Sequence, residues 1–208
     1  MSGFNYANLV TDIRNYTEVG DSVLTAAIIN RFIEDAEFKI FYDVPIDAYR
    51  YVSEGTFVAD DNTINAPGKG TQGATGAVFI RGIEVFNSTS ATTGQGVWLQ
   101  KKDQTYLSEY VGRLTGTEGD LTNQDTTALP KYYAMFGGAT GTTSTTSGGM
   151  YIAPTPDQNY KFRIYYTMMP KSLVTETGGT YISQYFPSGL LYACLVEAYG
   201  FLKGPADM

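Results

Sequence analysis

Hydrophobic residues recur at helical spacing at both ends of the chain. Near the N-terminus they fall three to five residues apart over residues 4–18, and the next segment carries Ile29, Ile33, Ala36 and Ile40 at spacings of four, three and four. That periodicity predicts two helices, the second capped by Asp21 or Ser22 and closed by Pro45, and we expect them to form an antiparallel hairpin. Residues 187–203 predict a third helix with almost no polar face, which must then be surrounded by other elements.

The pattern between the helices changes to short runs of alternating or aromatic residues, which is typical of β-strands. Clusters of Gly, Ser, Thr and Asn separate the runs, and almost every residue over 137–150 is Gly, Ser or Thr, which predicts a hairpin tip. Residues 104–114 predict one or two helical turns within this region. The predicted strands are 49–58, 63–65, 78–86, 97–100, 132–136, 150–153 and 160–168.

These elements predict an α+β protein: a small helical bundle made from both chain ends, with an inserted antiparallel β-domain of the sandwich or barrel type. The predicted domains are residues 1–44 plus 180–208 for the bundle and 45–179 for the β-domain. We expect the last helix to pack on the N-terminal helices, since it buries too much apolar surface to lie on a sheet edge.

Composition narrows the possible functions. Only 17% of the 208 residues are charged and the formal net charge is -7, so the surface must be covered largely by neutral polar residues. An acidic chain does not favour nucleic-acid binding, which depends on clustered Lys and Arg. No apolar run is long enough to predict a membrane span.

No residue pattern in the sequence supports a catalytic site. The chain has no His, so a catalytic triad or a histidine zinc site is excluded. Gly68–Gly73 fits a dinucleotide-binding motif by letters but lacks the strand before it and the helix after it. The acidic pairs Asp60–Asp61 and Glu118/Asp120 are better interpreted as solvated turns than as acid/base or calcium sites, and Cys194 as a small buried hydrophobe. We therefore predict no enzyme, catalytic residue, cofactor or metal site.

Three short motifs in the second half each join a strand to a proline corner: Leu129–Tyr133, Tyr151–Asp157 and Tyr165–Leu173. In this order, behind a helix pair and before an apolar helix, they resemble the head-to-tail adaptor (connector) proteins of tailed bacteriophages. The resemblance implies a structural virion protein that forms a ring of about twelve copies under the portal. It implies as partners other copies of itself, the portal and the tail tube or nozzle protein, with genomic DNA passing through without tight binding, and no membrane.

The resemblance also implies a location in the virion neck and assembly in the host cytoplasm. The alternative left open is a tail protein whose β-domain binds a receptor or a carbohydrate, because exposed tyrosines can stack on sugars. The residues that we predict to lie in protein interfaces are Tyr132, Tyr133, Phe201, Leu202 and Lys203.

Overall fold

The computed structural model of the chain describes residues 3–67, 76–88, 94–110, 127–135, 149–176 and 178–203. It confirms the α+β class: helices form at both ends of the chain and two sheets form in the middle. The chain divides into two compact units, residues 1–48 with 170–208 and residues 49–169. Residues 45–48 and 170–179, assigned above to the β-domain, thus fall within the helical unit.

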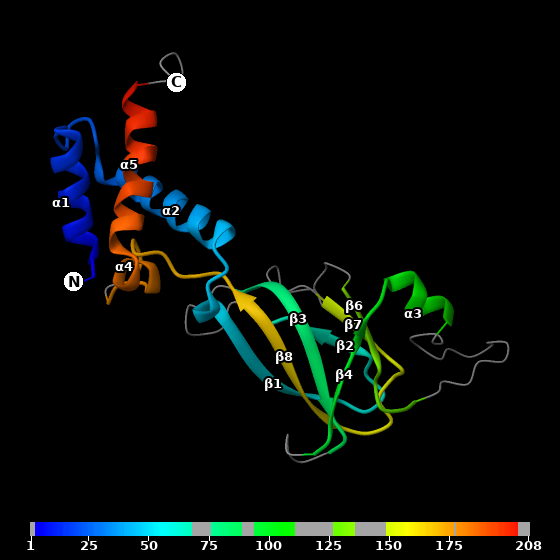
Figure 1. Cartoon of the computed structure of the whole chain (residues 1–208). Helices are drawn as coiled ribbons and strands as arrows, with labels where there is room; N and C mark the ends of the chain where they lie inside the picture. The colour runs from blue at the N-terminus through cyan, green and yellow to red at the C-terminus, as the bar shows by residue number, and fades with distance from the viewer. Residues whose placement is uncertain are drawn as a thin grey trace. The chain divides into compact units, whose positions relative to one another are not determined.

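The helical unit contains α1 (Tyr6–Thr17), α2 (Ala26–Asp43), α4 (Tyr181–Tyr185) and α5 (Pro187–Lys203). Its core consists of side chains with no exposed surface on α1, α2 and α5, which match the apolar spacing of the sequence. These are Leu9, Ile13, Ile29, Ile33, Ala36, Leu190, Cys194 and Ala198. In Figure 1 α5 lies beside α1, and α2 crosses them.

Two expectations about these helices were wrong. The first two helices are not an antiparallel hairpin, because each packs mainly on α5 instead of on the other. The second helix begins at Ala26, not after Asp21 or Ser22. A turn from Gly20 comes first, in which the N–H groups of Val23 and Leu24 donate to the Gly20 carbonyl and which delivers Leu24 to the core.

The β unit is a sandwich of two sheets with four strands each, which Figure 1 shows as two layers. In chain order its elements are β1 (Arg50–Phe57), β2 (Thr63–Asn65), β3 (Ala77–Phe86), β4 (Gly96–Trp98), β5 (Gln100–Lys101), α3 (Gln104–Tyr110), β6 (Tyr132–Met135), β7 (Gly149–Ala153) and β8 (Tyr160–Met168). A 3-10 turn, Asp47–Tyr49, precedes β1. All seven predicted strand regions are confirmed as strand.

Sheet A has the strand order β1-β8-β3-β4 and sheet B the order β2-β7-β6-β5. Neighbouring strands are antiparallel except β5 and β6, which run parallel. Side chains from both sheets, among them Phe57, Ile83, Ile152 and Ile164, form one apolar core. Each strand therefore keeps one row of side chains on the outer face of its sheet.

Several predicted features fall partly or wholly outside the described residues. Only Gly149 and Met150 of the loop 137–150 are described, and they begin β7. The glycine motif at 68–73, the acidic residues Glu118 and Asp120, and residues 111–114 of the predicted helical turns lie outside. Among the described helices, none combines the length and hydrophobicity that crossing a membrane requires.

Candidate interaction surfaces

The last helix has two apolar faces, of which only one is buried within the chain. Leu190, Leu191, Cys194, Leu195 and Ala198 face α1 and α2. Of the residues on the opposite side, Tyr192 is 61% exposed and Val196 69%, and Tyr199 also lies open to solvent. The expectation that other elements surround this helix was therefore wrong for the single chain.

The exposed residues of α5 form a continuous stripe. Tyr192, Val196 and Tyr199 are separated by four and three residues, the spacing that places side chains on one helix face. The Tyr199 hydroxyl donates a hydrogen bond of 2.9 Å to the Tyr16 carbonyl at the end of α1, which fixes that ring at the edge of the stripe. Exposed apolar and aromatic side chains that lie together on one helix face are a candidate site of protein association.

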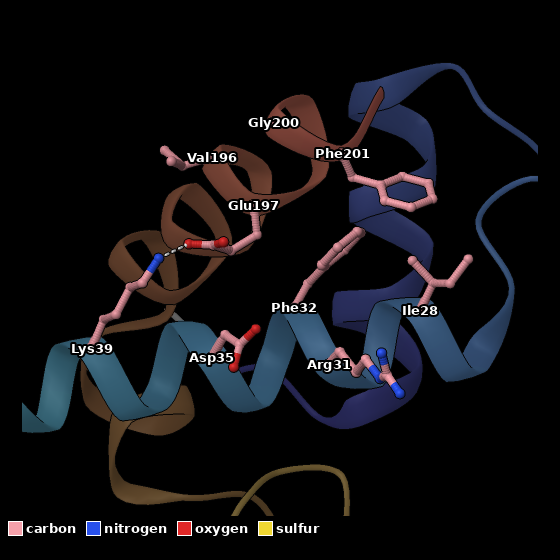
Figure 2. A pocket seen from close by; sticks show the side chains of 9 residues that line it. All are labelled: Ile28, Arg31, Phe32, Asp35, Lys39, Val196, Glu197, Gly200 and Phe201. Carbon is pink, nitrogen blue, oxygen red and sulfur yellow. Dashed lines mark hydrogen bonds and ion pairs between the residues drawn. The ribbon is translucent and has the colours of Figure 1, made fainter. Parts of the chain in front are cut away.

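A groove of about 560 Å³ lies between α2 and α5 (Figure 2). The rings of Phe32 and Phe201 meet at one end, with centroids 5.7 Å apart. Lys39 of α2 and Glu197 of α5 form an ion pair across the groove, which raises the pKa of Lys39. Because Lys39 is largely exposed, we assign this pair a role in shaping the groove and little net stabilisation.

A second, more apolar pocket of about 420 Å³ lies between the end of α2 and α4. Ile40, Val44 and Ile182 contribute to its lining, together with the exposed rings of Tyr185 and Phe186. Aromatic side chains presented beside a pocket are typical of the central part of protein interfaces. The helical unit thus offers three neighbouring features for partners: the α5 stripe, the groove and this pocket.

A buried carboxylate on α2 binds the segment between β8 and α4. The Glu37 side chain is only 4% exposed, and both of its oxygens accept the Leu173 N–H at 3.1 Å. Its Oε1 also accepts the Thr180 hydroxyl at 3.1 Å. Burial is the largest influence on this group and raises its pKa. The apolar spacing of α2 alone would place Glu37 on the polar, solvent-facing side of the helix, whereas the structure buries it.

The same segment leads into α4. Thr180 and Ser183 form a reciprocal capping box, in which the Ser183 N–H donates to the Thr180 hydroxyl and the Thr180 N–H to the Ser183 hydroxyl. The segment 170–180 is thereby held at both Leu173 and Thr180. These hydrogen bonds position α4, which lines the α2–α4 pocket and precedes α5.

The outer face of sheet A carries the single Trp of the chain. Trp98 is 56% exposed, and a Cβ added at Gly82 would lie 2.9 Å from its ring, so the indole lies directly over that glycine. The Tyr165 ring centroid is 4.9 Å from that of Trp98, and its hydroxyl donates to Glu84. Beside it, Arg163 pairs with Glu54 at 2.8 Å. Trp, Tyr and Arg are the residues enriched in energetically dominant positions of interfaces.

The family comparison agrees with a protein built around association surfaces. The model of the SU10 adaptor protein family matches residues 4–208, nearly the whole chain. The chain belongs to the SU10 adaptor protein family. It is therefore a bacteriophage adaptor, a structural component of the virion, and its family is not a family of enzymes. No match is found among curated proteins.

The predicted interface residues of this adaptor lie in both units. Phe201, Leu202 and Lys203 form the end of α5, and Phe201 lines the groove. Tyr133 and Tyr132 lie on β6, and the structure gives them opposite directions. Tyr133 is 3% exposed in the sandwich core, whereas Tyr132 packs with Leu107 and Tyr106 of α3 on the other face of sheet B. Because its ring lies in the core, Tyr133 cannot offer a surface to a partner.

The acidic residues considered above for acid/base catalysis or calcium binding have structural roles in the adaptor. Asp61 accepts hydrogen bonds from the Thr63 N–H and hydroxyl, at 2.9 and 2.7 Å, in the turn after β1. Asp60 has the left-handed φ of 62° that such turns require. Among the described residues, no group of three or more acidic or Cys side chains is arranged to hold a metal ion.

Cys194 is fully buried, as predicted, with its Sγ 3.9 Å from the Phe32 carbonyl. Burial raises the pKa of its thiol to about 12. We expect the native adaptor to react with a thiol reagent such as DTNB at pH 8 at least about a hundredfold more slowly than the urea-unfolded chain. Rapid reaction of the native protein would show that α5 separates from α2 in solution.

Proposed function

We propose that this adaptor forms a ring in the neck of the virion and joins the portal to the tail. The observation that carries the proposal is the exposed apolar stripe of α5, on a helix whose other face already completes the core of its unit. A helix with two apolar faces needs a partner on the second. A head-to-tail contact between copies closes into a ring when the rotation between neighbours divides a full turn.

The portal on one side and the tail tube or nozzle protein on the other are the proposed partners. The end of α5, with Phe201, Leu202 and Lys203, is the proposed contact with a neighbouring virion protein, and its Phe201 lines the groove in Figure 2. The ring would enclose part of the passage for genomic DNA, and the protein would join the particle in the host cytoplasm.

Negative-stain electron microscopy of the purified protein, alone and mixed with portal, tests this function. We expect rings on the portal in the mixture, and monomers or rings in the protein alone. The variant Val196→Asp, which changes the middle of the exposed stripe, should give fewer rings, whereas Lys131→Glu in the β unit should match the wild type. Absence of any complex with portal at micromolar concentration would contradict the proposal.

One observation favours the alternative of a receptor- or carbohydrate-binding tail protein. Trp98 presents an exposed indole on the face of a sheet, a surface on which sugar rings stack. Because it is the only Trp in the chain, its fluorescence reports directly on this surface. Saturable quenching by host surface polysaccharide would favour the alternative over the neck ring.

The charge distribution predicts that DNA is not bound tightly. The helical unit has 5 Lys and Arg against 11 Asp and Glu, which gives it -6 of the net charge of -7. Repeated around a ring, these charges would repel the duplex and let it slide. In gel-shift titrations at low salt we expect no retardation of duplex DNA below micromolar protein. Sub-micromolar affinity that falls steeply with salt would contradict this and would indicate a basic channel including Arg81, Lys101 and Lys102.

A further inference from the structure

Two oppositely charged aromatic surfaces lie on different units of the chain. The first is the exposed half of α2, where the tilted rings of Phe38 and Tyr42 pack with centroids 4.5 Å apart. Glu34, Asp35 and Asp43 are exposed around them. We call this set the α2 face.

The basic side chains of the α2 face do not offset its acidic ones. It also carries Arg31 and Lys39, and Lys39 is paired with Glu197 of α5. Counting Glu197, four carboxylates oppose two cations, a net charge of -2. The face is therefore an acidic surface with an aromatic centre.

The second surface is the outer face of sheet A. The register of β1, β8 and β3 places Arg50, Lys161 and Arg163 on it, and Arg81 joins them at the β3 bulge by donating to the Thr167 hydroxyl at 2.9 Å. The carboxylates on this face are Glu54 and Glu84. Four cations against two carboxylates give +2 in a chain whose net charge is -7.

Apolar side chains complete this second surface. The exposed ones are Val52, Phe79 and Trp98, with Tyr165 half-buried beside the indole. We call this set the sheet A face. It is basic and aromatic where the α2 face is acidic and aromatic.

We propose that the α2 face of one copy docks on the sheet A face of the next copy around the ring. This rests on the proposed ring function and adds a second pair of surfaces to the α5 stripe. Charges of -2 and +2 attract, and the aromatic side chains at the two centres supply apolar area. Because the two surfaces are different parts of the same chain, the contact is heterologous, and repeating it generates a ring when the rotation between neighbours divides a full turn.

Charge reversal on each surface tests the contact. One variant carries Glu34→Lys with Asp35→Lys, which changes the α2 face from -2 to +2, and another carries Arg50→Glu with Lys161→Glu, which changes the sheet A face from +2 to -2. Each protein is added to a lysate of adaptor-deficient phage, and the infectious particles formed are counted. Either variant alone places like charges at every junction, so we expect each to lose more than about tenfold of the joining activity.

Mixing the variants distinguishes this contact from general damage. In an alternating ring of the two variants every junction is again of opposite charge, and the same holds for one chain carrying all four substitutions. Both should restore joining to within about threefold of wild type. The control Lys101→Glu with Lys131→Glu, which changes charge by the same amount elsewhere in the β unit, should join like the wild type. Thermal unfolding by circular dichroism verifies that each variant is folded.

Two results would overturn the docking: variants that join as well as wild type, or losses that neither the mixture nor the four-substitution chain restores. Imaging of the wild-type necks separates these failures from failure of the ring itself. If the necks contain a ring while the mixture does not restore joining, only the assignment of the two faces is wrong. If they contain no ring, the proposed function fails independently of the variants.

Discussion

Replacing Leu195 by Asp is expected to unfold the helical unit, whereas the same replacement at Val196 leaves it folded. The two residues are neighbours on α5, but Leu195 is 5% exposed and Val196 is 69% exposed. An unpaired carboxylate in the core costs about 4 kcal/mol or more, a large share of the stability of an ordinary domain. Urea unfolding followed by circular dichroism at 222 nm measures both variants.

The two variants distinguish an effect on folding from an effect on association with other proteins. Leu195→Asp should lose helical signal and should not join tails. Val196→Asp should keep the wild-type free energy of unfolding within about 0.5 kcal/mol and still join tails poorly, because the changed residue lies in the exposed stripe. If Val196→Asp joins tails as well as wild type, the stripe is not an interface. Equal destabilisation by both variants would show that both faces of α5 are covered within the chain.

Glu37→Ala has the second largest expected effect on stability. The Leu173 N–H and the Thr180 hydroxyl both donate to this buried carboxylate, and in alanine they would have no acceptor there. Leaving buried donors unsatisfied should lower the free energy of unfolding by about 2 to 4 kcal/mol. Glu34→Ala, one turn earlier on α2 and exposed, is the matched control and should stay within about 0.5 kcal/mol of wild type.

The pH dependence of stability tests the state of the Glu37 carboxyl. Its pKa in the folded protein is raised above 4.5, its unperturbed value, so the folded state holds this proton more tightly than the unfolded chain does. The contribution of Glu37 to stability is therefore greatest below about pH 4.5 and declines as the pH rises through the folded pKa. Glu37→Gln removes this titration. Between pH 4 and 7 the wild type should lose stability relative to Glu37→Gln, and a constant difference would contradict the assignment.

The fold was predictable from the sequence because its signals are local. Ile29, Ile33 and Ala36 show the buried side of α2 by spacing alone, and the strand regions are bounded by Gly, Ser and Thr clusters. The short helix α4 was missed, because five residues cannot show a helical period and its cap uses Ser183 in place of the usual Glu or Gln. The parallel pairing of β5 with β6 was missed because residues distant in sequence determine it.

The candidate surfaces were only partly predictable. The sequence shows that α5 is apolar all round, but only the packing on α1 and α2 shows which side remains exposed. Glu37 has the residue type and spacing of a solvated helix position, and its burial depends on a segment more than a hundred residues later. Tyr132 and Tyr133 were both predicted to lie in interfaces. Alternation along a strand directs neighbouring side chains to opposite faces of the sheet, which explains why Tyr133 lies in the core, but the covering of Tyr132 by α3 could not be inferred from alternation.

The most direct test of the neck-ring proposal is a cryo-electron microscopy reconstruction of tail-joined virions that counts and places this protein. We predict a closed ring of about twelve copies between portal and tail, with α5 at a contact between proteins. One to three copies per virion, or a position at the far end of the tail, would contradict the account.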